Sequence, residues 1–307
     1  MSVANTVDTA RLNLLLNELR LPAIKVLWAQ FAEQSDKEGW PAARFLATIA
    51  EHEIAERGRR RTERHLVEAR LPAGKTFDSF DFEAVPMISK AQVMALAAGD
   101  SWLGKGANLL LFGPPGGGKS HLAAAIGLAL IENGWRVLFT RTTDLVQKLQ
   151  LARRELNLEA AINRLDRFDL LILDDLAYVT KDQAETSVLF ELISARYERR
   201  SMLITANQPF GEWNKVFPDP AMTLAAIDRL VHHATIVEMN VESYRNAVRD
   251  GRPCTRHPKP SLIDAPRQSE FNKTLAHDNL RGNHYFAATL TRHPDCRAFP
   301  SRSTRYR

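Results

Sequence analysis

The sequence predicts an α/β fold in which a small all-α domain precedes a core built on a five-stranded parallel sheet. Between residues 107 and 250, short apolar runs alternate with helical segments, the pattern of a parallel sheet with helices on both faces. Residues 8–70 instead carry leucine and aromatic residues at helical spacing. We therefore expect a helical domain at 1–70, a connector at 71–106 and the sheet domain at 107–250.

The overall composition is that of an ordinary soluble chain. Its 307 residues suit about two domains, and 45% of them are apolar against 25% charged, so a sizeable core is possible. The longest apolar stretches are too short to cross a bilayer, and the N-terminus does not have the pattern of a signal peptide. Cys254 and Cys296 are too isolated for a disulfide framework or a zinc site. We expect a cytoplasmic protein with no membrane span.

The segment 51–70 is strongly charged and contains five arginines within eight residues: Arg57, Arg59, Arg60, Arg61 and Arg64. Such a cluster can contact DNA phosphates without reading the base sequence. The alternative is a solvated helix face, balanced by Glu51, Glu53, Glu56, Glu63 and Glu68. Both interpretations stay open. If this cluster does not bind DNA, the next candidates are Arg196, Arg199 and Arg200.

Short apolar runs define the expected strands, and periodic segments between them define the helices. Strands are expected at 108–112, 135–141, 170–173, 202–205 and 234–239, and helices at 121–133, 144–156 and 183–200.

Residues 113–120, Gly-Pro-Pro-Gly-Gly-Gly-Lys-Ser, form a complete phosphate loop between the first strand and its helix. The glycines allow a tight turn whose backbone N–H groups point at a polyphosphate, and the following helix adds its positive end. Lys119 is expected to reach the β and γ phosphates, and Ser120 to offer its hydroxyl oxygen to Mg²⁺. The predicted ATP site comprises Gly113, Pro114, Pro115, Gly116, Gly117, Gly118, Lys119, Ser120 and His121. A glycine-rich turn without a ligand is the weaker alternative for a complete motif in this context.

The third strand ends in two carboxylates, Asp174 and Asp175. A buried strand with acids at its carboxyl end, about 55 residues after Lys119, is typical of a Walker B motif. We expect Asp174 to hold the Mg²⁺ shell through water, and Asp175 to orient or polarise the attacking water. An acidic pair that merely starts a loop would be the better interpretation if no phosphate loop preceded it.

Three further residues are candidates for contacts with the transferred phosphate. Asn207 follows the fourth strand and can hydrogen-bond the attacking water or the γ-phosphate, although an asparagine here can also simply form a loop. Arg229 and Arg245 can stabilise phosphate charge, from the same subunit or from a neighbour, or can form surface salt bridges. His232 and His233 have no clustered ligands in the sequence, so we expect packing or capping residues.

Residues 251–307 carry 11 Lys and Arg against 4 Asp and Glu, a local charge of +7, so the rest of the chain is near neutral. This tail is rich in Pro, Arg, His, Ser and Thr, and few of its apolar residues are periodic, which predicts disorder. It is either a basic DNA-binding arm or a nonadaptive extension of the reading frame, and the sequence alone favours the extension.

Eight blocks of the chain together resemble one protein family. They are EHEIAERGRRR at 51–61, RLPAGK at 70–75, NLLLFGPPGGGKSHL at 108–122, DLLILDDLAY at 169–178, FELISARYERR at 190–200, TANQPFGEW at 205–213, DRLVHHA at 228–234 and ESYR at 242–245. The resemblance is to the IstB-like and DnaC-like AAA+ ATPases, closest to the IstB transposition helpers, and it covers about residues 8–248.

This resemblance implies an AAA+ core, a helical domain that binds DNA or a partner, ATP-dependent homo-oligomers on double-stranded DNA, and delivery of a cognate transposase to its target. By position, Asn207 corresponds to sensor 1, Arg229 to the arginine finger and Arg245 to the sensor 2 arginine, while Asp175 stands where many AAA+ proteins carry glutamate. A DnaC-like replicative helicase loader is the alternative within the family. A small-molecule phosphoryl transferase and a module that binds ATP without hydrolysing it are alternatives of other classes.

Overall fold

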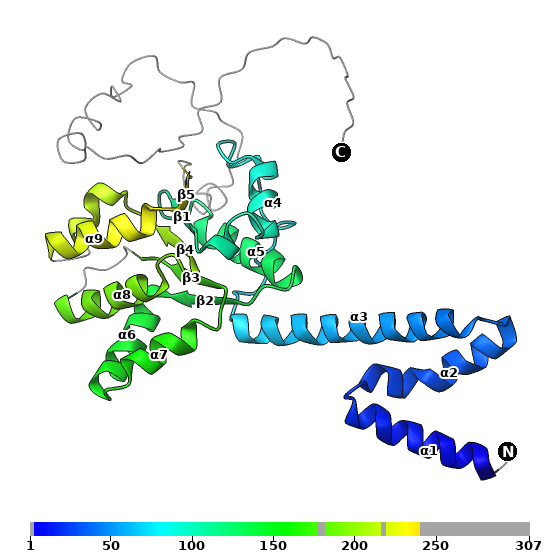
Figure 1. Ribbon diagram of the computed structural model, residues 1–307. Coiled ribbons are helices and arrows are strands. Elements are labelled where there is room, and N and C mark those ends of the chain that lie inside the picture. Colours follow the sequence, from blue (N-terminus) through cyan, green and yellow to red (C-terminus); the bar gives the residue numbers. More distant parts are fainter. Residues whose placement is uncertain (1–2, 177–181, 216–218, 240–307) are drawn as a thin grey trace, which may run out of the picture. The chain divides into compact units, whose positions relative to one another are not determined.

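The computed structural model describes residues 3–176, 182–215 and 219–239 (Figure 1). Arg245 and the basic tail at 251–307 lie outside these residues. In the described part of the chain, no helix combines the length and the apolar character needed to span a membrane.

The order of elements follows the predicted α/β pattern. Three helices come first: α1 (Val3–Glu18), α2 (Pro22–Glu38) and α3 (Ala42–Ala69). The core then contains α4 (Lys90–Ala98), η1 (Leu103–Lys105), β1 (Asn108–Phe112), α5 (Lys119–Glu132), β2 (Val137–Arg141), α6 (Thr142–Arg154), α7 (Leu158–Leu165), β3 (Leu170–Asp174), α8 (Gln183–Arg196), β4 (Ser201–Ala206), η2 (Phe210–Lys215), α9 (Pro220–Val231) and β5 (Ala234–Glu238).

Some helices differ from the expectation. α4 lies inside the stretch 71–106, for which the sequence predicts a connector; Ser89 caps its start and the left-handed Gly99 ends it. α7 follows α6 before β3, and α9 precedes β5; neither was predicted. α8 ends at Arg196, before its predicted end, because Glu198 adopts a left-handed conformation with φ 56°.

All five strands are parallel and lie in the order β2-β3-β4-β1-β5. β4 lies between β1 and β3, with Leu203 opposite both Leu109 and Ile172. Because parallel strands all end at the same edge of a sheet, this order brings the phosphate loop, the end of β4 and the two acids after β3 together. The predicted fold class is confirmed: a P-loop core on a five-stranded parallel sheet, preceded by helices.

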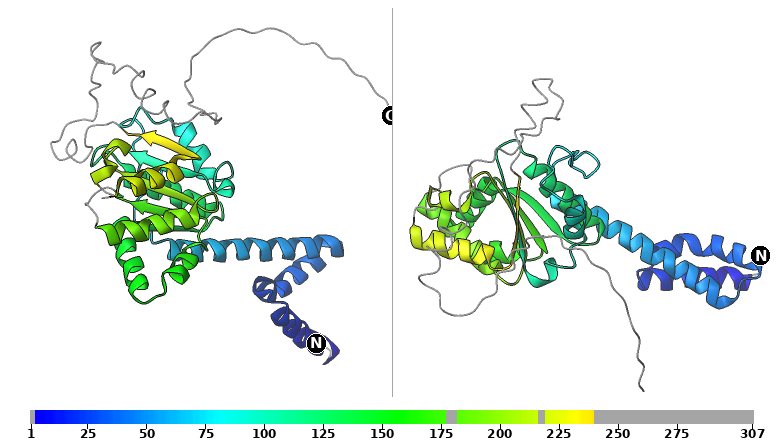
Figure 2. Two further views of the ribbon diagram at one scale, coloured as in Figure 1. Left: turned by 60° about the vertical axis from the view of Figure 1, so that its left-hand side comes forward. Right: turned by 90° about the horizontal axis from the view of Figure 1, so that it is seen from above.

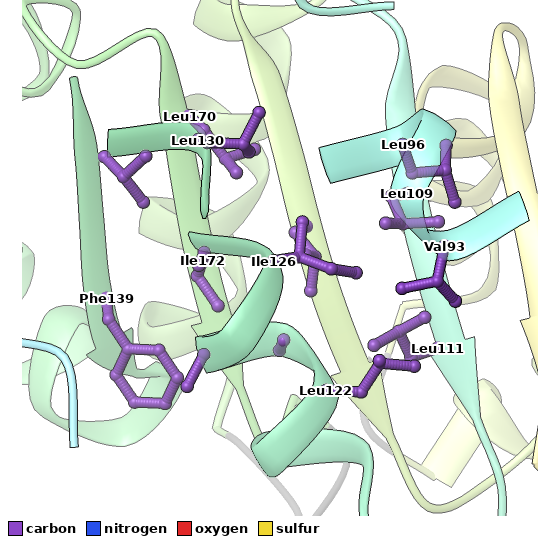
Figure 3. Packing of buried hydrophobic residues seen from close by; sticks show 14 of the residues in the cluster. Val93, Leu96, Leu109, Leu111, Leu122, Ile126, Leu130, Phe139, Leu170 and Ile172 are labelled. Atoms are coloured by element: carbon purple, nitrogen blue, oxygen red, sulfur yellow. The ribbon is translucent and has the colours of Figure 1, made fainter. Parts of the chain in front are cut away.

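Helices bury both faces of the sheet (Figure 2). Alternate side chains of β1 point to opposite sides: Leu109 and Leu111 pack against α4 and α5, whereas Leu110 packs against α6, α8 and α9. Figure 3 shows Ile126 of α5 within the first cluster, with Ile172 of β3 on one side and Leu111 of β1 on the other. Continuous burial explains why the strands read as unbroken apolar runs.

One buried carboxylate and a small apolar cluster join the three N-terminal helices. Leu16, Ile24 and Ile49 form the centre of the cluster. Glu53 of α3 is 3% exposed, and its Oε2 accepts hydrogen bonds from the backbone N–H groups of Ala23 (2.9 Å) and Ile24 (3.1 Å). These N–H groups belong to the first turn of α2, where a helix offers them no partner. Glu53 therefore caps α2 and is not part of a solvated helix face.

Arg196 joins three segments of the core from a fully buried position at the end of α8. Its guanidinium donates hydrogen bonds of 3.0 to 3.1 Å to the backbone oxygens of Leu165, Phe168 and Ser201, and lies 3.5 Å from Asp166. Burial lowers the pKa of the guanidinium to about 10, against the charge of Asp166, so it stays protonated at neutral pH. Arg196 is therefore a structural residue and was wrongly considered as a DNA contact.

We expect the substitution Arg196→Met to lower the free energy of unfolding by about 3 kcal/mol, because the buried guanidinium would no longer donate to the backbone oxygens of Phe168 and Ser201 or lie against Asp166. The matched control is Arg199→Met: the Arg199 side chain is 65% exposed and pairs with the same Asp166. Its loss should cost less than about 1 kcal/mol. Urea denaturation measures both values, and equal losses would contradict a structural role for Arg196.

Candidate nucleotide site

The phosphate loop fills the turn between β1 and α5, which begins at Lys119. Gly113 has φ 151°, and a Cβ there would come within 2.3 Å of the backbone oxygen of Met239. Gly118 has φ 88°, and a Cβ there would meet the ring of Phe80 at 3.2 Å. Both places require glycine, because of the positive φ and because Met239 and Phe80 pack closely against the loop there. Between them lie Pro114, Pro115, Gly116 and Gly117, and after Lys119 come Ser120 and His121 in the first turn of α5.

Lys119 is 5% exposed, and its ammonium folds back onto the loop. Its Nζ donates hydrogen bonds to the backbone oxygens of Gly113 (2.8 Å) and Pro114 (2.9 Å). Burial lowers the pKa of Lys119, and the nearby charges of Asp175 and Asp174 oppose that decrease. The structure thus brings the predicted lysine and both predicted acids within electrostatic reach of one another. A polyphosphate would offer the ammonium stronger acceptors than two carbonyl oxygens.

Asp174 is buried at the end of β3 and is fixed by two threonines. Thr205 of β4 donates its hydroxyl to Asp174 Oδ1 at 2.6 Å, and Thr142 donates to the backbone oxygen of Asp174 at 2.9 Å. Asp175 follows in a left-handed conformation with φ 57°, and its backbone N–H donates to Thr205 Oγ1 at 2.9 Å. Sequence reasoning missed both threonines. The only signal for Thr205 was a hydroxyl at the end of an apolar strand.

The stretch before α4 also borders the phosphate loop. His121 Nε2 lies 3.0 Å from the backbone oxygen of Thr76 and 3.1 Å from Ser79 Oγ. The ring of Phe80 meets the imidazole edge-on, with 5.3 Å between centroids. Burial lowers the pKa of His121, and the hydrogen bond to Thr76 opposes this. Residues 76–80 therefore form one side of the site, a contribution that the sequence did not reveal.

The other phosphate candidates lie at different edges of the sheet. Asn207 directly follows β4, which lies between β1 and β3, so it stands at the same edge as the phosphate loop. Arg229 lies in the last turn of α9, next to Leu230, whose backbone oxygen accepts a hydrogen bond from the Asn108 side chain at the start of β1. The length of β1 therefore separates Arg229 from the Lys119 of its own chain.

The Arg229 guanidinium is held between two helices. It donates a hydrogen bond of 2.9 Å to the backbone oxygen of Ala225 and lies 4.9 Å from the ring centroid of Phe190 on α8. These contacts hold Arg229 at the edge of the sheet where the strands begin, the amino edge. The Arg229 residue stays partly exposed there.

The expectation that no clustered ligands accompany His232 and His233 was wrong. Glu198 Oε1 lies 3.4 Å from His232 Nδ1 and 3.7 Å from His233 Nε2, and the three residues form an exposed group of possible metal ligands. The Tyr197 hydroxyl lies 2.5 Å from the same His232 Nδ1. The sharp turn after α8 brings Glu198 to the histidines from a distant part of the sequence, which is why the sequence did not show the cluster.

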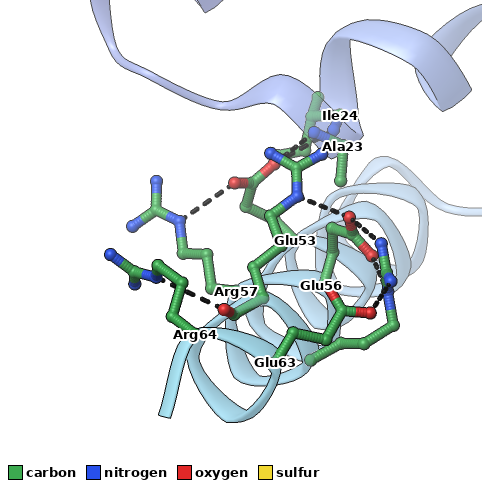
Figure 4. Close-up of polar contacts among 9 residues, drawn as sticks. Ala23, Ile24, Glu53, Glu56, Arg57, Glu63 and Arg64 are labelled. Carbon is green, nitrogen blue, oxygen red and sulfur yellow. Dashed lines mark hydrogen bonds and ion pairs between the residues drawn. The ribbon is translucent and has the colours of Figure 1, made fainter. Parts of the chain in front are cut away.

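The arginine cluster of α3 is largely paired within its own helix (Figure 4). Arg57 Nε lies 2.9 Å from Glu53, and Arg60 Nε lies 2.6 Å from Glu56. Arg59 pairs with both Glu56 and Glu63. Hydrogen bonds from Arg59 and Arg60 lower the pKa of Glu56 to about 2.

The two remaining arginines of the cluster have no such carboxylate partner within the described residues. Arg64 Nε donates to the backbone oxygen of Arg60 at 3.3 Å. The guanidinium of Arg61 lies beside Gly134, in the turn between α5 and β2. The geometry therefore favours a salt-bridged helix face for Arg57, Arg59 and Arg60, and leaves Arg61 and Arg64 as the better candidates for a phosphate contact.

Comparison with known proteins gives a consistent result. An insertion-sequence ATP-binding protein of Sinorhizobium fredii is 76% identical over 288 residues, which cover 91% of this chain and 96% of that protein. The IS21 ATP-binding protein of Pseudomonas aeruginosa is 36% identical and covers 76% of this chain and 88% of its own length. The IS5376 ATP-binding protein of Geobacillus stearothermophilus is 34% identical, with a coverage of 75% of this chain and 91% of its own length.

The match to the Sinorhizobium protein also concerns the basic tail. An alignment that covers 91% of the chain must include a substantial part of residues 251–307, wherever it begins. The tail is therefore shared with this relative, which argues against a chance extension of the reading frame in this chain. The family model of the IstB-like ATP binding proteins matches residues 14–250. This range is most of the chain and nearly all of its described part. The chain belongs to this family, the IstB-like ATP binding proteins.

Proposed function

We propose that the chain is an ATP-dependent, DNA-binding AAA+ helper that assembles on target DNA and recruits or stimulates a cognate transposase in the cytoplasm. The relatives named above, all ATP-binding proteins of insertion sequences, support a role in transposition. The observation that carries the ATP-dependent part is the convergence of Lys119, Asp174 and Asp175 at one edge of the sheet.

The site fits ATP and Mg²⁺. The glycine loop leads directly into the amino end of α5, where backbone N–H groups can bind phosphate, and Ser120 and Asp174 supply the hard oxygen donors that Mg²⁺ prefers. When bound, Mg²⁺ neutralises phosphate charge. Lys119 would hold the β and γ phosphates, Asp175 would orient or polarise the attacking water, and Asn207 would hydrogen-bond that water or the γ-phosphate.

Arg229 is proposed to complete the site of a neighbouring subunit. It lies at the amino edge of the sheet, whereas the phosphate loop of the same chain lies at the carboxyl edge. A head-to-tail assembly can bring these two edges together, and an arginine then stabilises the charge of the transferred phosphate from outside. The family resemblance assigns the sensor 2 role to Arg245.

A mixing experiment tests this arrangement. Lys119→Ala and Arg229→Ala proteins should each be inactive alone, and mixing them should restore part of the ATPase rate, because some interfaces then contain an intact Lys119 facing an intact Arg229. Phosphate release measures the rate, and analytical ultracentrifugation shows whether the two variants assemble together. Co-assembly without any recovery would contradict action of Arg229 in trans.

DNA binding is proposed to use Arg61 and Arg64. Replacing both with alanine should reduce the slope of log affinity against log salt concentration by about 1.8 for duplex DNA, about 0.9 per lost phosphate contact. The matched control replaces Arg59 and Arg60, which removes the same charge from side chains that are already paired. Fluorescence anisotropy measures both slopes. Unchanged affinity and slope in both variants would place the DNA surface outside α3.

Strand-transfer assays with a purified cognate transposase test the transposase role. The full-length protein should stimulate strand transfer into duplex target DNA only when it can bind ATP, and Lys119→Ala should abolish the stimulation. Stimulation that is independent of ATP would contradict the proposal. If the chain instead bound a replicative helicase and placed it on single-stranded DNA, the helicase-loader alternative would be correct.

A further inference from the structure

Thr205 has a hydroxyl in a place where sequence and burial favour an apolar side chain. It follows Met202, Leu203 and Ile204 in β4 and is fully buried. A buried hydroxyl is costly unless its hydrogen bonds are made. The partners that Thr205 finds are both acids of the candidate site.

Thr205 holds the end of β3 through three hydrogen bonds. Its Oγ1 donates to Asp174 Oδ1 at 2.6 Å and accepts from the backbone N–H of Asp175 at 2.9 Å, while its backbone oxygen accepts from Leu176 N at 2.9 Å. The direction of each bond is determined, because an N–H group can only donate and a carboxylate can only accept. One hydroxyl therefore fixes the rotation of the Asp174 carboxylate and the backbone of the next residue.

The backbone of Asp175 needs such support. Its φ of 57° lies in the left-handed region, which is unfavourable for residues other than glycine and persists only where the surroundings enforce it. The N–H groups of Asp175 and Leu176 both donate hydrogen bonds to oxygens of Thr205 and so hold the backbone on each side of Asp175. They turn the chain out of the strand directly after Asp174.

We propose that Thr205 is a positioning residue that presents Asp174 to Mg²⁺ and Asp175 to the reacting phosphate. This inference rests on the proposed Mg²⁺-dependent nucleotide site. Thr205 touches neither ligand and acts through the two acids, as the outer partners of metal ligands commonly do. Since Asn207 lies two residues after Thr205, just beyond the end of β4, Thr205 also ties the position of this candidate to that of the acids.

The test measures Mg²⁺-dependent binding of a fluorescent ATP analogue, mant-ATP, to the full-length protein. In Thr205→Val, which removes the hydroxyl but keeps the shape, the Mg²⁺ concentration for half-maximal enhancement of binding should rise by about tenfold or more. Affinity for mant-ATP in EDTA should not change, because the phosphate loop is intact. Thr205→Ser, which keeps the hydroxyl, should restore most of the Mg²⁺ response.

A control on the same strand is available. Ser201 is a buried residue at the amino end of β4, and its hydroxyl finds no hydrogen-bond partner among the residues that the structure describes. Ser201→Ala should behave like the wild type. An effect of Thr205→Val would then be specific to Thr205, because the loss of another buried hydroxyl from β4 has no effect.

Two results would overturn the inference. One is a wild-type Mg²⁺ response in folded Thr205→Val. The other is a loss of affinity for mant-ATP in EDTA in Thr205→Val, if Thr205→Ser does not restore that affinity. This result would show that the side chain only maintains the fold. The readout requires neither hydrolysis nor DNA. A wild-type protein that binds Mg²⁺ and nucleotide but does not act on DNA would refute the proposed function and still report on Thr205.

Discussion

Replacing Lys119 with alanine is expected to raise the Kd for ATP at least about 100-fold. Lys119 Nζ is buried against the phosphate loop and already uses two backbone oxygens as acceptors. Phosphate oxygens would replace them with charge-assisted hydrogen bonds, which contribute about 1.5 to 3 kcal/mol each. The loss of two such bonds corresponds to about 3 kcal/mol, or roughly 100-fold in affinity.

The matched control for this substitution is Lys148→Ala. Lys148 is an exposed residue of α6, so the control removes the same unit of charge away from the phosphate loop. Isothermal titration with ATP and Mg²⁺ measures both affinities, and circular dichroism checks that the variants are folded. Near wild-type affinity in folded Lys119→Ala would refute the assignment of the nucleotide site.

The parts of the site that the sequence revealed are local. The bounds of β1 were predicted because an apolar run meets a glycine loop directly, and β3 was recognised because its apolar run ends in two acids. Lys119 and Asp174 then follow from their places at the ends of parallel strands. A single sequence carries this information because each motif is contiguous and its chemistry is unusual.

The parts that the sequence did not reveal depend on contacts between distant segments. Thr205 meets Asp174 across neighbouring strands, and His121 meets residues 76–80 across a loop. Nothing local distinguishes such a threonine from any other β-branched strand residue. Glu53 shows the same limit: it looked like one glutamate of a charged helix face, yet it is buried and caps another helix.

Asp175→Asn is expected to separate nucleotide binding from turnover. The substitution keeps the size and the hydrogen-bonding groups of the side chain but removes its negative charge, so it can no longer act as a base toward the attacking water. Its backbone N–H remains available to Thr205, which preserves the local conformation. ATP affinity should therefore stay within a few fold of the wild type, whereas kcat should fall by about 100-fold or more.

The control for this experiment is Asp175→Glu, which keeps the carboxylate and lengthens the side chain by one methylene group. If the negative charge is required, Asp175→Glu should have a higher kcat than Asp175→Asn. If the length of the aspartate side chain is required instead, the two variants should have equally low kcat values. Steady-state phosphate release in the presence of duplex DNA gives kcat. A wild-type rate in Asp175→Asn would show that Asp175 does not activate the attacking water.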